Sequence, residues 1–236
     1  MNELPSPTFA LSQIAMPRRA VQPRICPLPA AVVPAAAKPA AGKVSLSWAR
    51  HQDEVRQAQR LRYAVFALEM GATLPVTVPG CDIDLFDDYC KHLLVRALNS
   101  GEVIGTYRVL TPTQAKRVGS TYSDTEFDLT RLRALRSRRV ELGRSCVHAK
   151  HRHGGVTLAL WGALAEFMER NRLDTMMGCV SMAMQHNGVN TGQAAASIWR
   201  QVKQTHLAPI EYRVTPRLAL PVVANSTTRS ILSHQR

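Results

Sequence analysis

The first clear pattern of hydrophobic and polar positions in the chain has a helical period. Between residues 52 and 70 the apolar side chains recur about every 3.6 positions, at Val55, Ala58, Leu61, Val65 and Leu68. Gly71 comes soon after the last of them, and a glycine beyond a periodic segment is typical of a helix end. The pattern therefore predicts an amphipathic helix over residues 52–70.

The next segments have the composition of β-strands. Residues 92–98 and 102–110 are largely apolar, and Asn99-Ser100-Gly101 separates them. Two such runs joined by a short turn that contains glycine are typical of a β-hairpin. Residues 111–126 show no sustained period, so we interpret them as a loop.

The second half of the chain alternates between the two kinds of pattern. It predicts strands over residues 139–147, 174–182 and 210–215, and helices over residues 156–168 and 191–204. A hairpin followed by strand–helix–strand crossovers implies a mixed, mostly antiparallel sheet flanked by helices. The predicted fold class is therefore α/β.

The two ends of the chain lack this patterning. Residues 1–43 contain eight of the fourteen prolines and no hydrophobic period. Such a segment buries too little apolar surface to offset the entropy lost on ordering. We therefore expect a disordered arm over residues 1–43, one folded domain over residues 44–222, and a tail over residues 223–236.

Cysteine content and hydropathy bear on the cellular location. The five cysteines are an odd number and include no C-x-x-C pair, which favours reduced thiols over disulfides or a zinc site. No apolar run reaches the roughly 18 residues that span a bilayer, and the N-terminal segment lacks the pattern of an export signal. We expect a cytoplasmic protein that binds no metal ion.

The net charge narrows the classes of partner. The chain has 30 lysine and arginine residues against 17 acidic ones, a net charge of +13. The predicted arm holds five of the basic residues and one acidic residue, so the remainder keeps 25 against 16. Most of the excess positive charge therefore belongs to the folded part. This charge is expected to attract nucleic acid, an anionic membrane or an acidic protein.

Basic residues flank the predicted strand 139–147. They are Arg131, Arg133, Arg136, Arg138, Arg139, Lys150, His151, Arg152 and His153. Surfaces that bind nucleic acid usually interleave such charges with aromatic or groove-reading elements, and this group has none. An acidic carrier protein is the favoured partner over nucleic acid, and a solvated basic face stays open as the alternative.

A candidate phosphate site follows the same strand. Arg152, Gly154 and Gly155 lie between this strand and the predicted helix 156–168. The N-terminus of a helix presents unpaired backbone N–H groups and a partial positive charge, which bind phosphate. Backbone N–H groups near Cys146 and Val147, at the end of the strand, are candidates to hold a developing oxyanion. An ordinary tight turn is the alternative interpretation.

Glu141 and Arg144 are three residues apart on the predicted strand, so on a regular strand they face opposite sides. Gly143 lies between them and is a natural position for a β-bulge, which would return Arg144 to the face of Glu141. A bulge also turns backbone N–H groups toward a developing oxyanion. A surface ion pair is the alternative.

Six further residues are candidates for substrate contacts: Arg62, Phe66, Asp84, Asp87, Arg108 and Phe127. The first two lie four apart on one helix face, and the two aspartates can present both carboxylates to an ammonium group. Each also has an ordinary structural explanation: an arginine that extends to solvent, core aromatics, turn carboxylates and a charge at a strand edge.

Taken together, several motifs resemble a known family. They are Arg62-Tyr63-Ala64-Val65-Phe66, Asp84-x-x-Asp87, Gly105-Thr106-Tyr107-Arg108-Val109-Leu110, Glu126-Phe127-Asp128-Leu129 and Glu141-Leu142-Gly143-Arg144-Ser145-Cys146-Val147. In this order they are similar to the L-ornithine Nα-acyltransferases of the GNAT superfamily, which are related to acyl-homoserine-lactone synthases. The resemblance covers about residues 50–220.

The resemblance implies a GNAT-like fold and the transfer of a 3-hydroxyacyl group from acyl carrier protein to ornithine, which gives lyso-ornithine lipid. The donor would be a phosphopantetheine thioester, and no permanently bound cofactor is implied. The same resemblance assigns the eight polar and aromatic residues above, including Glu141 and Arg144, to the active site. We expect Glu141 to act as the base.

Three other functions stay open. A lactone synthase would consume S-adenosylmethionine, although Trp48, Trp161 and Trp199 do not match the tryptophans of those enzymes. An acetyl-CoA-dependent N-acetyltransferase would share the phosphate turn. A basic nucleic-acid-binding protein would show a steep salt dependence and no thioester turnover. A peripheral contact with the anionic inner face of a membrane is a further expectation.

Overall fold

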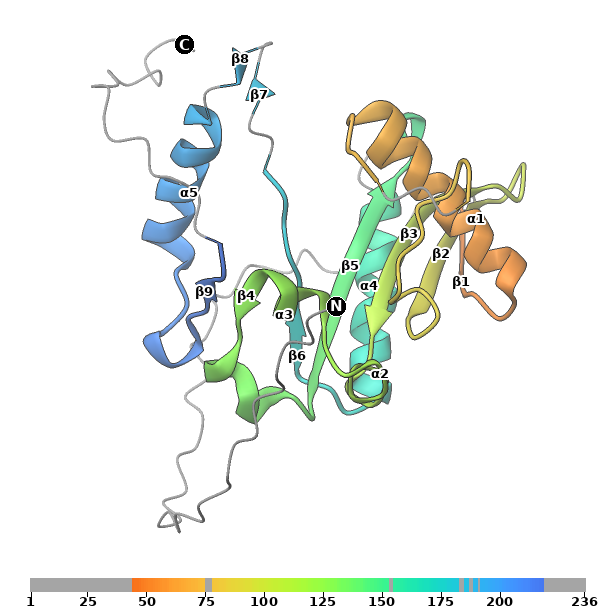
Figure 1. Ribbon diagram of the computed structural model, residues 1–236. Helices are drawn as coiled ribbons and strands as arrows, with labels where there is room; N and C mark the ends of the chain where they lie inside the picture. The colour runs from red at the N-terminus through yellow and green to blue at the C-terminus, as the bar shows by residue number, and fades with distance from the viewer. Residues whose placement is uncertain are drawn as a thin grey trace, which may run out of the picture. The chain divides into compact units, whose positions relative to one another are not determined.

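The computed structural model describes residues 44–74, 78–152, 155–182, 185–186, 189–190 and 192–218. Its main feature is a five-stranded sheet in the order β1-β2-β3-β5-β6 (Figure 1). The strands are β1 (Val44–Trp48), β2 (Lys91–Ala97), β3 (Val103–Leu110), β5 (Arg139–Val147) and β6 (Thr175–Met177). Neighbouring strands are antiparallel except β5 and β6, which are parallel. The predicted mixed, mostly antiparallel α/β sheet is confirmed.

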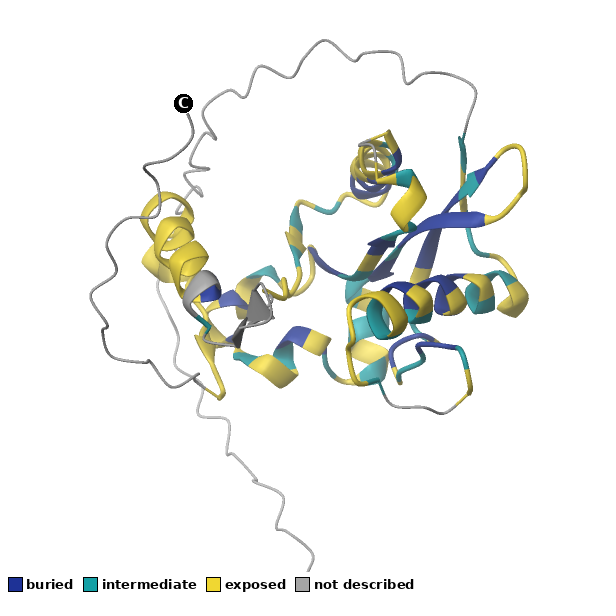
Figure 2. Cartoon of the chain, turned by 90° about the horizontal axis from the view of Figure 1, so that it is seen from above, coloured by how far each residue is buried: buried dark blue, intermediate teal, exposed yellow. Residues whose placement is uncertain are grey.

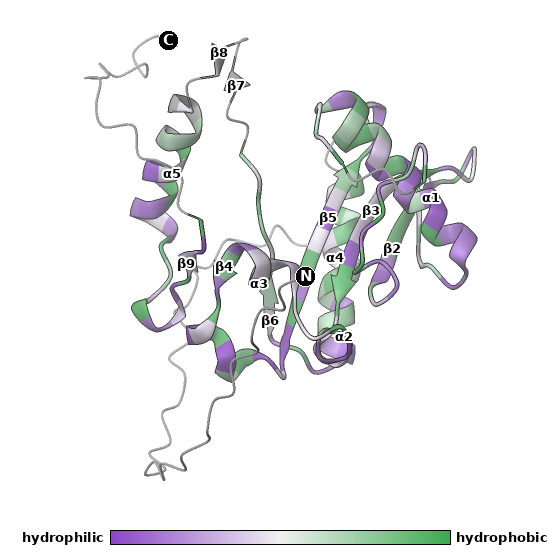
Figure 3. Ribbon diagram, in the orientation of Figure 1, coloured by the Kyte–Doolittle hydropathy of each residue, from purple (hydrophilic) through white to green (hydrophobic). Residues whose placement is uncertain are grey.

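Helices cover both faces of this sheet because successive strand residues point to opposite sides. On one face Leu93 and Val95 of β2 pack with α4 (Gly155–Arg170). On the other face Leu94 packs with α1 (Gln52–Tyr63). Figure 2 shows the buried residues along the strands and on the sheet-facing sides of these helices, and Figure 3 shows apolar positions along β2 and α4.

The predicted helix over residues 52–70 is confirmed, with one difference in its geometry. α1 continues without a break into a π-helical segment, Ala64–Glu69. Gly71 then has φ of +69°, a left-handed conformation that glycine adopts without steric cost, and the helix ends there. The hairpin of β2 and β3, the strand β5 and the helix α4 also lie where the pattern predicts them.

The predicted loop over residues 111–126 is wrong. This segment forms two short helices, α2 (Pro112–Val118) and α3 (Tyr122–Glu126). Thr111 caps α2 by accepting a hydrogen bond from the Gln114 N–H, and Pro112 occupies the first turn. Thr121 and Asp124 form a capping box at α3. The two helices are too short to show a hydrophobic period, so their capping residues were the only signal in the sequence that indicated them.

The C-terminal part also departs from the pattern. The strand predicted over residues 174–182 pairs only as far as Met177, and Val180 beyond it is 88% exposed. The strand predicted over residues 210–215 is wrong, because Ile210–Tyr212 is a 3₁₀ helix. Beyond it, β9 (Thr215–Pro216) pairs with β4 (Phe127–Asp128). In residues 174–182 and 210–215, apolar composition alone did not distinguish exposed positions from buried ones.

The remaining elements complete the described chain. Two 3₁₀ helices, Thr130–Leu135 and Ala149–His151, precede and follow β5. β7 (Gln185–His186) pairs with β8 (Val189–Asn190), and α5 (Gln193–His206) agrees with the helix predicted over residues 191–204. The strand β1 was not predicted. The proposed arm and the C-terminal tail lie outside the described residues.

The residues that the structure describes include neither a membrane-spanning helix nor a metal-binding cluster of side chains. Within these residues, no helix combines the length and the apolar character that crossing a membrane requires. In the same part of the chain, no three histidine, cysteine or acidic side chains gather where they could hold a metal ion.

Close packing between β3 and α4 gives a testable prediction. A Cβ added at Gly105 would lie 2.6 Å from Cγ1 of the buried Val156. Gly105→Ala should therefore lower the free energy of unfolding by about 1–3 kcal/mol, measured by urea denaturation. Gly162→Ala is the control, because nothing lies within 4 Å of its added Cβ and alanine favours a helix.

Replacement of Val156 by alanine should make room for the new methyl group. The cost of Gly105→Ala should then be smaller in a Val156→Ala background than in the parent chain. An equal cost in both backgrounds would show that this contact does not set the packing of α4 on β3.

Candidate active site

A network of buried charges joins α1 to the segment that precedes β2. Arg62 is fully buried, and its Nε donates to Asp82 Oδ2 at 2.9 Å. Its Nη2 donates to Asp87 Oδ2 at 2.7 Å and also to the Asp82 backbone carbonyl. Both aspartates are themselves buried. Buried charges are tolerated only when they are paired and hydrogen-bonded, so Arg62 and these two carboxylates depend on one another.

Arg108 extends this network from β3. Its Nη1 donates to Asp84 Oδ1 at 2.6 Å and to Asp87 Oδ1 at 3.1 Å. Its guanidinium lies 5.8 Å from the centre of the Phe86 ring. Burial disfavours the charged form of Arg108, but the adjacent Asp84 carboxylate outweighs that effect and raises the pKa of Arg108. Arg108 therefore stays charged inside the protein.

Asp87 is the carboxylate at the centre of the network. Burial alone would raise its pKa, but the Arg62 and Arg108 guanidinium groups prevail and lower it. His92 Nε2 donates to the Asp87 carbonyl at 3.0 Å. Burial lowers the pKa of His92 despite that hydrogen bond, which favours the neutral imidazole. The charge of Asp87 is thus balanced by arginine rather than by histidine.

A bulge in β5 brings Arg144 to the same network. Arg108 pairs with Gly143 and Thr106 with Cys146, so the single residue Tyr107 of β3 faces both Arg144 and Ser145. The predicted bulge is present, and Arg144 itself takes the left-handed conformation with φ of +51°. Its guanidinium lies 3.6 Å from Asp82, 3.5 Å from Asp84, and 5.9 Å from the centre of the Phe66 ring.

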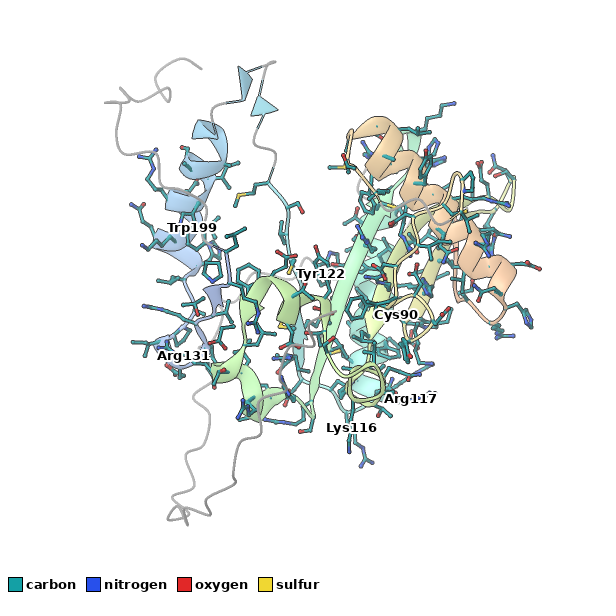
Figure 4. The ribbon with its side chains drawn as sticks, in the orientation of Figure 1. Cys90, Lys116, Arg117, Tyr122, Arg131 and Trp199 are labelled. Carbon is teal, nitrogen blue, oxygen red and sulfur yellow. The ribbon has the colours of Figure 1, made fainter. Side chains whose placement is uncertain are left out.

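The alternative interpretation, a surface ion pair between Glu141 and Arg144, is wrong. Among the described residues Arg144 pairs with Asp82 and Asp84, because the bulge turns its side chain toward the aspartates. Glu141 is buried, and its two carboxylate oxygens accept hydrogen bonds from the Tyr122 and Ser123 N–H groups at 2.7 and 2.6 Å. Glu141 therefore anchors the start of α3, where Figure 4 labels Tyr122, to β5.

Three other predicted site residues lie outside the charge network. Phe127 begins β4 and pairs with Pro216, in a two-stranded sheet apart from the strands that carry the network. Cys146 and Val147 pair with Thr106 and Gly105 beyond the bulge. Burial raises the pKa of the Cys146 thiol to about 12, which keeps it protonated near neutral pH.

The candidate phosphate turn is partly occupied by protein contacts. Arg152 donates to the Val147 carbonyl at 3.0 Å and to both carboxylate oxygens of Glu69. Arg152 is therefore engaged, and a phosphate would have to compete with Glu69 for it. Gly155 is the first residue of the 16-residue helix α4. Gly154 lies outside the described residues.

The predicted basic cluster does not form one surface. Strand β5 separates its two halves: Arg139 and Val147 are eight residues apart, which is roughly 26 Å on an extended strand. Arg139 is buried, and Arg136 and Arg138 pair with Asp124 and Asp174. The cluster was predicted from closeness in sequence, whereas the strand places its halves at opposite ends.

Asp82 is the residue that the sequence interpretation missed. It accepts from Arg62 and lies 3.6 Å from Arg144, so it joins the part of the network from α1 to the part from β5. The spacing Asp82-x-Asp84 was visible in the sequence. However, nothing in that spacing indicated that the first carboxylate would be the more deeply buried of the two.

Comparisons with known proteins agree with this architecture. Residues 61–162 match the family model described as acetyltransferase (GNAT) domain. An L-ornithine N(alpha)-acyltransferase of Rhodobacter capsulatus is 41% identical over 140 residues, which cover 56% of this chain and 54% of that protein. The enzyme of the same name from Brucella abortus is 37% identical over 149 residues, which cover 59% and 53%. The chain thus spans about half the length of the curated relatives it matches.

Among solved structures, a CoA-dependent acyl-homoserine lactone synthase, BjaI, is similar at 23% identity and a TM-score of 0.44. The match covers 58% of this chain and 66% of that one. The family resemblance that the motifs predicted is confirmed by the named relatives. Residues 61–162 are therefore similar to a GNAT acetyltransferase domain, and over the matched region the chain is similar to the L-ornithine Nα-acyltransferases.

Proposed function

We propose that this chain transfers a 3-hydroxyacyl group from acyl carrier protein to the α-amine of ornithine, which gives lyso-ornithine lipid. The observation that carries the proposal is the charge network beside the bulge of β5, which lies within the part of the chain that matches the GNAT domain. The names of the relatives support ornithine as the acceptor. A site that binds an amino acid needs a carboxylate for its ammonium group and a cation for its α-carboxylate. The network offers both.

The accessible members of the network are the best candidates to contact the acceptor. Asp84 and Arg144 have side chains that are 17% and 26% exposed, whereas Arg62 and Asp87 are almost completely covered. Asp84 would hold a cationic end of ornithine, and Arg144 would hold its carboxylate. Arg62, Asp87 and Arg108 then act as positioning residues that fix these two side chains.

The donor thioester is proposed to lie along the bulged end of β5. The N-terminus of α4 would attract the phosphate of the phosphopantetheine arm, with Arg152 released from Glu69 to reach it. Backbone N–H groups near Cys146 and Val147 would stabilise the oxyanion. The high pKa of the Cys146 thiol supports direct transfer between the two bound substrates rather than an acyl-cysteine intermediate.

The amine of the acceptor must lose a proton to attack the thioester. Glu141 is our candidate for the base, acting through a water molecule, because both of its oxygens already accept backbone N–H groups. The amine nitrogen forms the new amide bond and the carrier thiol leaves with the thioester electron pair. The proton released by the amine balances the one taken up by the departing thiolate.

A direct assay tests the proposed reaction. The full chain is incubated with 3-hydroxyacyl-carrier protein and ornithine, and free carrier thiol and product mass are followed together. We expect N-acylornithine whose fragmentation places the acyl group on the α-nitrogen, with little product from acetyl-CoA. Product from acetyl-CoA but not from the carrier would identify an N-acetyltransferase instead. A cyclic product that requires S-adenosylmethionine would identify a lactone synthase.

The role of Glu141 as a base can be separated from its structural role in holding α3 against β5. Glu141→Gln should lower kcat roughly 10²- to 10⁴-fold near neutral pH, and part of the loss should return at higher pH, where more free amine exists. Thr121→Val is the matched control, because it removes the cap of α3 but leaves the Glu141 carboxylate in place. The pH profile of kcat for both variants is the measurement.

Equal rate losses in Glu141→Gln and Thr121→Val, with no recovery at high pH, would contradict the base assignment. Glu141 would then act only by holding α3 against β5. Asp84 would become the next carboxylate to test, since its side chain is 17% exposed whereas Glu141 is buried.

A further inference from the structure

A second concave site lies where β5 begins, next to α2. It has a volume of about 520 Å³, which is within the range of small-molecule pockets. Three of the side chains that line it are cationic: Lys116 from α2, and Arg136 and Arg139 from the start of β5 and the segment before it. Asp124 is the one acidic residue that lines this pocket. The side chains that line the pocket therefore carry a net positive charge.

Arg139 is the unusual member of this lining. Only 5% of the residue is exposed, yet no carboxylate among the described residues lies within ion-pair distance of it. Nη1 of Arg139 donates a long hydrogen bond of 3.5 Å to the Leu132 carbonyl. Burial lowers the pKa of Arg139, and the more distant Asp124 and Glu141 carboxylates only partly oppose this. A buried guanidinium normally has an anionic partner, so this one is under-paired.

The acidic residue in the lining is already engaged. Asp124 Oδ2 accepts from the Thr121 N–H at 2.9 Å and from the Thr121 hydroxyl at 2.8 Å in the capping box of α3. Its Oδ1 lies 3.5 Å from Arg136. The hydroxyl side chains of Thr113, Ser120 and Ser137 also line the pocket and can donate hydrogen bonds. Donors thus surround the pocket from several directions.

This pocket lies toward the opposite end of β5 from the bulge, and its residue Arg139 is two residues from Glu141. Arg139 and the bulge at Gly143 are four residues apart, roughly 13 Å along an extended strand. The α-carboxylate of an acceptor lies next to its reacting amine, so it cannot reach Arg139 while the amine is at the bulge. The phosphate turn at Arg152 is farther still, beyond the end of β5.

We propose that this pocket binds a phosphate group. A guanidinium fork, a lysine and several hydroxyls arranged around a concave site match the oxygens of a tetrahedral oxyanion better than the flat face of a carboxylate. The group belongs either to a soluble phosphate compound or to the headgroup of an anionic phospholipid. The proposal is independent of the acyl-transfer reaction.

Neighbouring residues of α2 supply the test and its control. Figure 4 labels Lys116 and Arg117, which are adjacent in α2, and only Lys116 lines the pocket. Arg117 donates to Gln114 of its own helix at 3.2 Å. Binding of inorganic phosphate to the full chain is measured by titration calorimetry at constant ionic strength, with chloride as the balancing ion.

We expect Lys116→Met to weaken phosphate binding about threefold, as for an exposed charge contact, and Arg117→Met to leave it unchanged. Arg139→Met should weaken binding about tenfold or more, because it removes a buried charged donor. If Arg139→Met does not fold, Arg136→Met takes its place, since that side chain is 57% exposed. Equal losses from Lys116→Met and Arg117→Met would overturn the proposal.

Two further arms locate the bound group and identify its source. If Arg152→Met alone abolishes binding, phosphate is held at the turn before α4 and the proposed pocket is wrong.

Vesicles of phosphatidylcholine with and without phosphatidylglycerol are then added to the phosphate-bound protein. Displacement of phosphate only by the anionic vesicles, lost in Lys116→Met, assigns the site to a lipid headgroup. Retained phosphate assigns it to a soluble phosphate compound. No phosphate binding by the parent chain contradicts the proposal outright.

Discussion

The ion pairs of Arg62 are the interaction on which the candidate site depends. Arg62 comes from α1, and its partners Asp82 and Asp87 come from the segment that leads into β2. Removing a guanidinium and two carboxylates from water is costly, and pairing inside the protein offsets that cost only when the geometry is maintained. The network therefore fixes the segment around Asp84 at the position where Arg108 and Arg144 reach it from the sheet.

A second constraint acts through Glu141, whose carboxylate holds the first turn of α3 against β5. The acids of the site are thus all engaged: Asp82, Asp84 and Asp87 by arginines, and Glu141 by backbone N–H groups. For Asp87 the neighbouring arginines outweigh burial and lower the pKa of the carboxyl group. The acids of the site can orient a cationic acceptor, and Glu141 can take the proton of the amine only through a water molecule.

Much of the fold could be predicted from hydrophobic period, because α1, the β2–β3 hairpin, β5 and α4 each bury a regular face. The short helices α2 and α3 could not, since seven and five residues do not establish a period. The bulge in β5 was predicted from Gly143, but the direction of Arg144 depends on its own left-handed backbone. Pairs distant in sequence, such as Arg152 with Glu69, also had no local signal.

A double-mutant cycle tests directly whether Arg62 and Asp87 stabilise the protein as a coupled buried pair. The free energy of unfolding is measured in urea for Arg62→Met, Asp87→Asn and the double variant. Each single change should cost roughly 3–5 kcal/mol, because it leaves the partner charge buried and unpaired. The double variant should cost less than the sum of the two by at least about 1 kcal/mol. Costs that add to within about 0.5 kcal/mol would show that the two residues act independently, and would contradict this account of the site.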